Sequence, residues 1–397
     1  MNRVLVINIG WEQQPLLLRL AERGYDIYGV HYTNAREGNV ELADLHICDL
    51  RDLSSISEYS QRVQPDMVIS DQCDYSHFAQ AVVSEQLGLP GPSIEAAQVS
   101  SNKFLQRSLS QELGVDVPAF RLCKSPVEAQ EAAKEIGYPV VLKPVDNRGS
   151  FGVNKVSVSK QIRSAYWDAL LNSHSRFVLV EEFIEGVHIT VDGYAFPKSG
   201  CRSVALATKT LLGDSARQVA TDIIYPGELP DQLCKKAMKV NETVNKALGY
   251  EFGMTHSEYM VTDEERIVLI ESANRGGGCF TSEIIAPNVS GIDLTAQLIA
   301  QAEGDLLDLY QEPQDIPTIL KFITLAPGTV SRIDGLTDAR DQDGTLALRL
   351  QVQEGTEIQS VTTDADRHGF IIYSADAEVR KGAVDALDLI KVTYEGT

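Results

Sequence analysis

Basic residues are scarce in this sequence. Lys and Arg number 35 against 56 Asp and Glu among 397 residues, which gives a formal net charge of −21. Proteins that bind nucleic acid rely on Lys and Arg to contact phosphates, and anionic membrane surfaces attract the same basic residues. The charge balance therefore argues against both kinds of partner, and we expect neither nucleic acid nor a membrane.

Long apolar runs and paired cysteines are absent too. No segment approaches the roughly 20 consecutive apolar residues of a membrane-spanning helix, and the start, MNRVLVINIG, lacks the cleavage site of a signal peptide. The cysteines are scattered and form no CxxC pair: Cys48, Cys73, Cys123, Cys201, Cys234 and Cys279. Scattered thiols without an export signal are typical of a reducing compartment, so we predict a cytoplasmic protein.

The dinucleotide-binding fingerprint GxGxxG is missing as well. Only Gly10 follows the first apolar run, so we predict no dinucleotide site there. Strand patterns at 3–9, 26–32 and 65–71 alternate with helix patterns at 15–24 and 77–88. Such alternation predicts a parallel, doubly wound α/β sheet, which we assign to residues 1–95.

Asp71 and Asp74 lie just past the third of these predicted strands. Sheets of this kind bind ligands at the carboxyl ends of their strands, so both carboxylates are candidates for a binding site. Loop carboxylates are more often simply solvated, and we interpret these two in that way.

Beyond a Pro- and Gly-rich hinge at 89–93, helix and strand patterns are mixed. Helices are predicted at 102–114, 231–249 and 292–304, and strands at 138–144, 177–184, 188–196, 255–261 and 266–272. From residue 317 onwards the pattern turns β-rich. We therefore expect a central domain at 96–310 and a β-rich C-terminal subdomain at 317–397.

Two glutamates face each other if residues 255–272 fold as a hairpin about the turn TDEE. The expected pairs are Val261 with Val268, Met260 with Leu269, and Glu258 with Glu271. Like charges directly opposite each other destabilise a sheet pair, so we infer a cation between the glutamates. Hard carboxylate oxygens suit Mg²⁺. A slip of one residue would separate the glutamates, but it would also break the apolar pairing.

Basic residues and glycines accompany this hairpin. Arg275 lies near the glutamates, where a guanidinium suits a substrate carboxylate or a developing oxyanion. The glycines at 276–278 let the backbone approach a ligand closely. Lys143 ends a buried strand before the glycine-containing loop 146–153, an arrangement that often holds phosphates, and Lys103 opens a helix. A single lysine of this kind usually just reaches solvent, but together these residues suggest a nucleoside triphosphate with Mg²⁺.

Five stretches in this order resemble the ATP-grasp superfamily. They are SNKFLQRSLSQELGVDVP, YPVVLKPVDNRGSFGV, VLVEEFIEGVHITVD, GMTHSEYMV and LIESANRGGG. The similarity covers about residues 100–305 and implies an α+β ATP-grasp fold with an ATP lid near 138–184. By resemblance, Lys103 and Lys143 would bind ATP phosphates. The loop 146–152, with Ser150 and Gly152, would be the part of the lid over them.

The resemblance implies roles for the other site residues too. The strand Glu181, Glu182, Phe183 and Ile184 would read adenine through its backbone, with Glu181 taking the amino group. Glu258 and Glu271 would hold Mg²⁺, with Mn²⁺ as a substitute. Arg275 would bind the carboxylate substrate and the acyl phosphate. Lys209 resembles a lysine that many relatives place near the reacting groups, with a solvated loop lysine as the alternative. His256 would order the amine or the metal shell, or else be a satisfied core histidine.

Two positions depart from the usual pattern. Many relatives carry a ribose-binding glutamate where this chain has His188, but biotin-carboxylase-like members place a histidine there, so we predict that His188 contacts ribose. Many members also read E-x-N-x-R at the metal site, whereas here Ala273 replaces the asparagine. Asn274 would point to the other face of the strand unless the strand bulges. These features and the tail, with LAPGTVSRIDG and DRHGFIIYS, resemble the L-amino-acid ligase branch of the bacilysin-synthetase type.

The resemblance therefore implies an ATP-dependent carboxylate–amine ligase. It would form an amide or peptide bond through an acyl phosphate, releasing ADP and phosphate, from a small carboxylate and an amine, one of them an amino acid. The alternatives are a ligase that joins an amino acid to a non-amino-acid carboxylate in siderophore or natural-product biosynthesis, and an ATP-binding module without catalysis. Relatives are often homodimers, although no interface is visible in the sequence.

Overall fold

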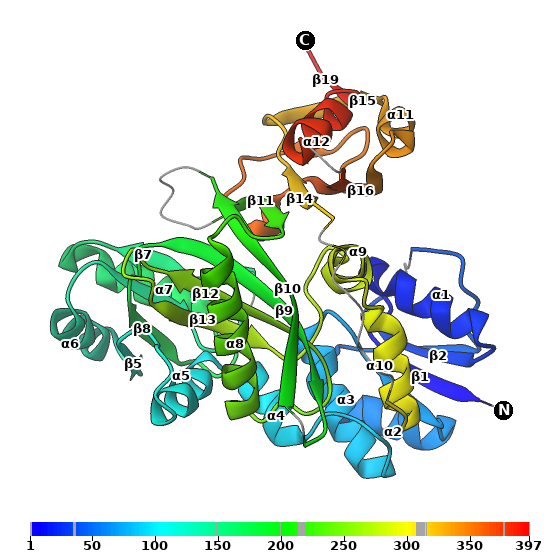
Figure 1. Cartoon of the computed structure of the whole chain (residues 1–397), viewed down its shortest axis with the longest axis horizontal. Coiled ribbons are helices and arrows are strands. Elements are labelled where there is room, and N and C mark those ends of the chain that lie inside the picture. The colour runs from blue at the N-terminus through cyan, green and yellow to red at the C-terminus, as the bar shows by residue number, and fades with distance from the viewer. Residues whose placement is uncertain are drawn as a thin grey trace.

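The protein has three parts that follow one another along the chain (Figure 1). The computed structural model describes residues 2–34, 37–147, 149–198, 200–212, 219–306, 314, 316–375 and 378–396. The N-terminal part packs beside the central part, and the C-terminal part caps one end of both. None of the helices in the described residues is long and apolar enough to cross a membrane.

Parallel strands form the N-terminal sheet, in the order β3-β2-β1-β4. The strands are β1 (Arg3–Ile7), β2 (Asp26–His31), β3 (Asp44–Ile47) and β4 (Met67–Ile69), and the helices are η1 (Trp11–Gln13), α1 (Gln14–Glu22), α2 (Leu53–Val63) and α3 (Asp74–Leu87). Residues 4–7 of β1 are fully buried, as their continuous apolar pattern predicts for a strand covered on both faces. The predicted α/β class is confirmed, and β3 is a strand that the sequence pattern did not reveal.

A second sheet, of order β5-β8-β6-β7, begins the central part. Its elements are α4 (Ile94–Ser100), α5 (Lys103–Glu112), β5 (Phe120–Cys123), α6 (Pro126–Ile136), β6 (Val140–Pro144), β7 (Asn154–Val156), η2 (Ser159–Gln161), α7 (Ile162–Leu171) and β8 (Val178–Glu182). Asn102 caps α5 by accepting hydrogen bonds from two N–H groups of its first turn. Lys103 is therefore held at the first position of that helix.

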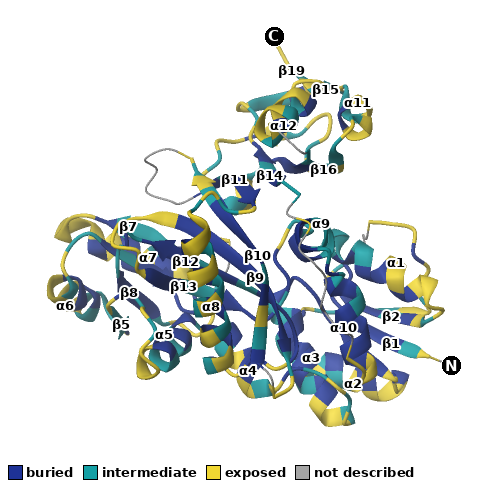
Figure 2. Ribbon diagram, in the orientation of Figure 1, coloured by how far each residue is buried: buried dark blue, intermediate teal, exposed yellow. Residues whose placement is uncertain are grey.

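The largest sheet runs from the central part into the C-terminal part, in the order β13-β12-β9-β10-β11-β14-β18-β16. Its central elements are β9 (Val187–Phe196), β10 (Gly200–Leu211), β11 (Ala220–Tyr225), α8 (Asp231–Ala247), β12 (Gly253–Val261), β13 (Ile267–Ala273), the π-helical turn η3 (Thr281–Ile285), α9 (Ala286–Ser290) and α10 (Leu294–Glu303). Buried residues gather along β9, β10 and β12, whereas the outer helices expose one face (Figure 2).

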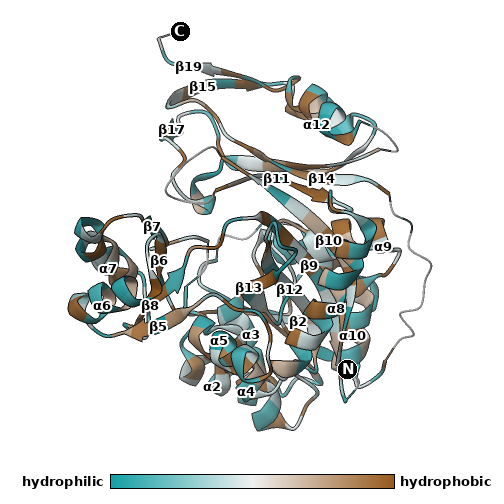
Figure 3. Cartoon of the chain, turned by 60° about the vertical axis from the view of Figure 1, so that its left-hand side comes forward, coloured by the Kyte–Doolittle hydropathy of each residue, from teal (hydrophilic) through white to brown (hydrophobic). Residues whose placement is uncertain are grey.

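The C-terminal part shares this sheet and adds a smaller one, of order β17-β15-β19. Its elements are β14 (Thr318–Ile323), β15 (Gly328–Asp334), α11 (Leu336–Asp341), β16 (Thr345–Leu350), β17 (Glu357–Ile358), η4 (Asp364–Asp366), β18 (Gly369–Ser374), α12 (Val379–Leu387) and β19 (Lys391–Tyr394). Figure 3 shows α12 above the β11–β14 end of the large sheet, where Ala383 and Ala386 join a buried apolar cluster. The region is β-rich, as predicted, but it is continuous with the central sheet.

Candidate active site

Two carboxylates face each other across the hairpin of β12 and β13. Glu258 pairs with Glu271, in agreement with the sequence-based prediction. Nearer the turn, the pairs are Tyr259 with Leu269, Met260 with Val268, and Val261 with Ile267. The predicted partners of Met260 and Val261 are therefore wrong by one residue. Strand β13 carries one extra residue, Ile270, in a bulge, and this bulge restores the register that sets the glutamates opposite each other.

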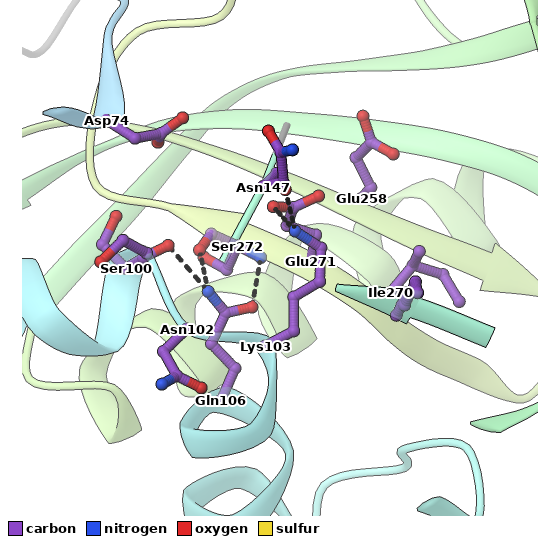
Figure 4. Close-up of polar contacts among 12 residues, drawn as sticks. Asp74, Ser100, Asn102, Lys103, Gln106, Asn147, Glu258, Ile270, Glu271 and Ser272 are labelled. Carbon is purple, nitrogen blue, oxygen red and sulfur yellow. Dashed lines mark hydrogen bonds and ion pairs between the residues drawn. The ribbon is translucent and has the colours of Figure 1, made fainter. Parts of the chain in front are cut away.

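Each of these glutamates has a lysine partner from a different element. The Nζ of Lys209, on β10, lies 2.5 Å from Oε1 of Glu258, and the Nζ of Lys103 lies 2.7 Å from Oε1 of Glu271. Lys103 also donates to the carbonyl oxygen of Asn147, as Figure 4 shows. Asn147 belongs to the loop 146–152 that is predicted to hold phosphates, called here the phosphate-loop candidate. Because the Lys209 side chain is only 11% exposed, the alternative of a solvated loop lysine is wrong.

Two histidines lie near the Glu258 carboxylate. The Nε2 of His188 is 3.0 Å from Oε2 of Glu258, and the Nε2 of His256 is 3.9 Å from its Oε1. Burial alone would raise the pKa of Glu258, but Lys209 and His188 hold that pKa well below its usual range. Glu258 is therefore ionised, which is the state that a metal ligand needs.

His256 belongs to a buried chain of hydrogen bonds. Its Nδ1 lies 2.7 Å from Oδ1 of Asp192, which is fully buried, and the hydroxyl of Tyr225 donates to the other oxygen of Asp192 at 2.7 Å. The carboxylate thereby fixes the orientation of the imidazole ring. His256 is thus a partnered histidine whose second ring nitrogen, Nε2, faces the Glu258 carboxylate.

Lys143 and Glu181 form a buried ion pair with Arg107, a residue of α5. The Nζ of Lys143 lies 2.5 Å from Oε2 of Glu181, and the Nε of Arg107 lies 2.8 Å from Oε1. All three side chains are at most 6% exposed. Burial lowers the pKa of Lys143 to about 8, although Glu181 opposes the shift. The cluster holds two cations and one carboxylate, so its spare positive charge suits an anion.

The phosphate-loop candidate, residues 146–152, lies between β6 and β7. Gly152 has a φ of +70°, and a Cβ there would lie 3.1 Å from the Cα of Ala169, so glycine lets the loop pack against α7. The hydroxyl of Ser150 donates to Oδ2 of Asp364 at 3.1 Å. The loop is therefore held from the C-terminal part of the chain as well as from its own domain.

An apolar wall continues the predicted adenine strand. Ile184, Met260 and Val268 form a small buried cluster, with Ile270 packed against it. The Nζ of Lys155, from β7, lies 3.7 Å from the centre of the Phe183 ring. Apolar walls with a few polar groups are typical of sites for flat organic ligands, so this region suits a nucleobase.

Arg275 is held by the N-terminal part of the molecule. Its Nε and Nη2 lie 3.0 and 3.3 Å from the two oxygens of Asp74, and its Nη1 donates to the carbonyl of Gly276. The Asp74 side chain is 14% exposed, and Asp71 is 2% exposed. The interpretation of both as solvated loop carboxylates is therefore wrong, because packing of the two parts buries the carboxyl ends of these strands.

Two opposed carboxylates fit Mg²⁺, although they do not form a complete protein cage. Within the described residues, no group of three or more His, Cys, Asp or Glu side chains gathers as a metal site. Mg²⁺ commonly takes one or two carboxylates and completes its shell with water and substrate phosphates. Asn274 lies away from the pair, because its Nδ2 donates to the carbonyls of Phe252 and Met254.

Four residues of this site were not foreseen: Arg107, Asp192, Asp364 and, in its role as a partner of Arg275, Asp74. The spacing of Lys103 and Arg107 places both on one face of α5, so that signal was available. Asp192 lies four residues after His188 on β9 and therefore on the same face of the strand, which was a second signal. For Asp364, nothing in the sequence indicates that it reaches a loop more than 200 residues away.

Comparison with known families finds two domains in this chain. The ATP-grasp domain matches residues 136–283, and the L-amino acid ligase C-terminal domain 2 matches residues 321–395. The first match includes the loop 146–152, the predicted adenine strand and the carboxylate pair, and the second includes most of the C-terminal part. The resemblance inferred from the sequence motifs is thereby confirmed.

Individual proteins agree with these domain matches. The chain is 27% identical over 317 residues to the uncharacterised protein y4rH of Sinorhizobium fredii, and the match covers 77% of this chain but only 64% of that relative's length. It is 26% identical to a D-alanine–D-alanine ligase of Acidovorax ebreus, over 56% of this chain and 70% of the relative.

Solved structures share the fold over the full chain. The L-amino acid ligase of Bacillus licheniformis matches with a TM-score of 0.86 at 18% identity, covering 100% of this chain and 99% of that one. The phosphoribosylglycinamide synthetase of Anaerococcus prevotii matches with a TM-score of 0.78 at 17% identity, covering 99% and 100%. At such identities, the likeness establishes the fold.

Proposed function

We propose that this chain, which carries an ATP-grasp domain, is a ligase that joins a small carboxylate to an amine through an acyl phosphate, with an amino acid as one of the two substrates. The observation that carries this proposal is the opposition of Glu258 and Glu271, with a lysine beside each. Opposed carboxylates beside cations suit a divalent metal and the phosphates it accompanies. A structural hairpin has no need of them.

ATP would lie between the two central sheets. Lys103, Lys143 and the loop that contains Ser150 would contact its phosphates, and His188 would contact the ribose. Both oxygens of Glu181 are bound by Lys143 and Arg107, so we assign Glu181 the orientation of Lys143 in place of a contact with the adenine amino group.

The adenine contacts would then come from the strand backbone. The N–H groups of Glu182 and Phe183 already donate to the carbonyls of Ala119 and Pro139. We therefore assign the backbone contact to Ile184 and to the carbonyl groups of the strand. The apolar wall of Met260 and Val268 would cover one face of the base.

Mg²⁺ held by Glu258 and Glu271, or Mn²⁺ in its place, would supply charge neutralisation for the transferred phosphoryl group. The protein residues do the rest. Arg275, held by Asp74, would bind the substrate carboxylate and stabilise the oxyanion at the acyl carbon. Lys209, which lies beside Glu258, would neutralise negative charge on the phosphoryl group as it is transferred.

The chemistry has two balanced steps. The substrate carboxylate oxygen attacks the γ-phosphorus of ATP, which gives an acyl phosphate and ADP. The amine nitrogen then attacks the acyl carbon, the C–O bond to phosphate breaks, and the amine loses one proton as orthophosphate leaves. Acyl phosphates hydrolyse, so the loop at 146–152 would exclude water during the reaction. His256, oriented by Asp192, would order the incoming amine.

The test is orthophosphate release from ATP in the presence of Mg²⁺, across amino acids and small carboxylates offered singly and in pairs. We expect release only with a matching pair. Glu271→Gln should lower the rate roughly a hundredfold or more, because charge stabilisation at the metal is worth several kcal/mol. Glu264→Gln, in the exposed turn of the same hairpin, is the matched control and should leave the rate unchanged.

The other outcomes have definite meanings. Release of pyrophosphate in place of orthophosphate would show adenylation and exclude the acyl phosphate. A product containing a non-amino-acid carboxylate would favour the natural-product type of ligase. Tight ATP binding with no turnover for any pair would favour an ATP-binding module without catalysis.

A further inference from the structure

A small cavity lies where the N-terminal sheet meets the end of β13. Its volume is about 10 Å³, and its walls include Ser70, Asp71, His77, Asn274 and Arg275. A cavity of roughly this size accommodates one water molecule. The cavity adjoins the residue that we propose binds the substrate carboxylate.

Three of the lining residues each carry a buried polar atom with no hydrogen-bond partner in the protein. These atoms are Oδ2 of Asp71, Nε2 of His77 and Oδ1 of Asn274. The residues are 2%, 5% and 1% exposed. Buried polar atoms are almost always paired with protein or with ordered water, so three orphan atoms around one cavity need a common explanation.

The remaining polar atoms of two of these residues are already engaged. The Nδ2 of Asn274 donates to the carbonyls of Phe252 at 2.7 Å and Met254 at 3.1 Å. Because both of its amide hydrogens are used, the amide orientation is fixed and Oδ1 must be the open acceptor. Oδ1 of Asp71 accepts from the N–H of Gln72 at 2.7 Å, which leaves Oδ2 as the open oxygen.

We propose that this cavity binds a single water molecule that links His77 and Asp71 of the N-terminal part to Asn274 of β13 and its following loop. The water would accept a hydrogen bond from Nε2–H of His77 and donate one each to Asp71 and Asn274. Three hydrogen bonds are the usual number for a buried water. All three orphan atoms would thereby be satisfied.

The ionisation of the surrounding groups agrees with this pattern. Burial lowers the pKa of His77 to about 4, so the imidazole is neutral at pH 7 and offers one N–H. Burial and the neighbouring Asp71 raise the pKa of Glu283 well above its usual range. This shift favours the protonated form of Glu283, which offers a donor toward Asp71, whose oxygens have room for that donor as well as for the water.

Water fits this cavity better than a monovalent cation. In the tautomer proposed here, with the proton on Nε2, His77 offers no lone pair to a cation at that atom. A cation would also lie close to the guanidinium of Arg275, which lines the same cavity. Water both accepts and donates, as the three orphan atoms require.

The water would help to position Arg275. Asn274 precedes Arg275 directly, and Asp74 holds the guanidinium itself. His77 and Asp74 both belong to α3, so one helix of the N-terminal part would fix the backbone and the side chain of the substrate-binding arginine. His77 is then a positioning residue, and this consequence rests on the function proposed above for Arg275.

The first test is a crystal structure of the full chain at a resolution that shows ordered water. We expect one peak within hydrogen-bonding distance of the three orphan atoms. An empty cavity would overturn the proposal, and so would an ion, identified by its anomalous signal after replacement of potassium by thallium. This measurement does not depend on activity, so it stands even if the ligase function is wrong.

The second test compares kinetics. His77→Phe keeps an aromatic ring at this position but removes the N–H donor. We expect the KM for the carboxylate substrate to rise roughly three- to tenfold, the factor that one hydrogen bond is worth. The KM for ATP should change less than twofold. His77→Gln, which places a donor near the same point, should restore the KM for the carboxylate. His46→Phe, the same change at a half-buried histidine elsewhere in the N-terminal part, should have no effect.

An unchanged carboxylate KM in His77→Phe would overturn the positioning role. If the KM values for the carboxylate and for ATP rise equally in both His77→Phe and His77→Gln, the role of His77 is generally structural, and the positioning role is overturned as well. Thermal unfolding of each variant, measured alongside, separates a misfolded sample from a misplaced arginine.

Discussion

At the scale of single residues, the most informative group is the buried cluster of Arg107, Lys143 and Glu181. Burying charges costs free energy unless they are paired, yet this cluster contains one more cation than carboxylate. The uncompensated charge lies beside the loop proposed to hold phosphates. We infer that the cluster tolerates this imbalance because an anionic ligand completes it.

Lys143 leads to a pH prediction. Its pKa is lowered to about 8, first by burial, so the ammonium loses its proton as the pH rises through that value. Since kcat/KM for ATP reports ionisations of the free enzyme, we expect it to fall above a pH of about 8. In Lys143→Arg, whose side chain stays charged, the fall should move to higher pH. A profile that is identical in both proteins would assign the ionisation to another group.

Glu181 leads to a stability prediction. Glu181→Gln leaves Arg107 and Lys143 buried without a carboxylate, so we expect a loss of about 3–5 kcal/mol in the free energy of unfolding. Urea denaturation measures it. Glu131→Gln removes one partner of an exposed pair with Arg121, and it should cost less than about 1 kcal/mol. Equal losses in the two variants would contradict the assignment of Glu181 as the central anion.

At the scale of elements, helix α5 and strand β13 build the site together. One face of α5 contacts three consecutive residues of the strand: Arg107 donates to the carbonyl of Ile270, Lys103 to the carboxylate of Glu271, and Gln106 to the carbonyl of Ser272. Figure 4 shows Gln106 and Lys103 side by side on the helix. The bulge at Ile270 is therefore held from outside the hairpin, and with it the register of the carboxylates.

The glycine run after β13 gives a prediction at the same scale. A Cβ on Gly276 would lie 2.6 Å from Oδ1 of Asp71 and 2.8 Å from Oγ of Ser282, whereas on Gly278 the nearest atom would be 3.4 Å away. We expect Gly276→Ala to destabilise the protein by about 1–3 kcal/mol through overpacking. Gly278→Ala should cost under about 0.5 kcal/mol. Chemical denaturation measures both, and the reverse order would refute this account of the loop.

At the scale of the whole molecule, the C-terminal part reaches the proposed ATP site. Asp364 accepts hydrogen bonds from the hydroxyl of Ser150 and from the N–H of Ala220, and it forms an ion pair with Arg367. The C-terminal part also shares the large sheet through the pairing of β11 with β14. The proposed nucleotide site and the C-terminal part of the chain are therefore physically connected.

The charge of Asp364 gives the prediction for this connection. A carboxylate bonded to Ser150 opposes the approach of phosphates, so Asp364→Asn should lower the KM for ATP by roughly threefold, the size expected for a partly screened charge. Glu357→Gln, an exposed acid of the same part, is the control and should have no effect. A higher KM in Asp364→Asn would mean that the carboxylate supports the loop instead.

Sequence patterns predicted the elements that carry many of the candidate residues, because these residues lie on regular helices and strands. Strand alternation predicted that Glu258 faces Glu271, and the structure has this pair because of the bulge at Ile270. The apolar run before Lys143 placed that lysine at the end of a buried strand. The prediction that Asp71 and Asp74 are solvated was wrong. Whether a carboxylate at the end of a strand is solvated or buried depends on which other part of the molecule packs against that end. The predicted partners of Met260 and Val261 were wrong because the bulge in β13 depends on contacts with α5, a helix far away along the chain.

The sequence by itself determined the α/β class, the elements that carry the candidate residues and the family to which the ATP-grasp domain belongs. These follow from local periodicity and from motifs that act within a few residues. Only the tertiary structure decided that Asp74 holds Arg275, that Glu181 is enclosed by two cations, and that Asp364 bonds to the loop of Ser150. Each of these contacts joins segments distant in the chain, and such contacts follow from packing between elements, which local patterns do not encode.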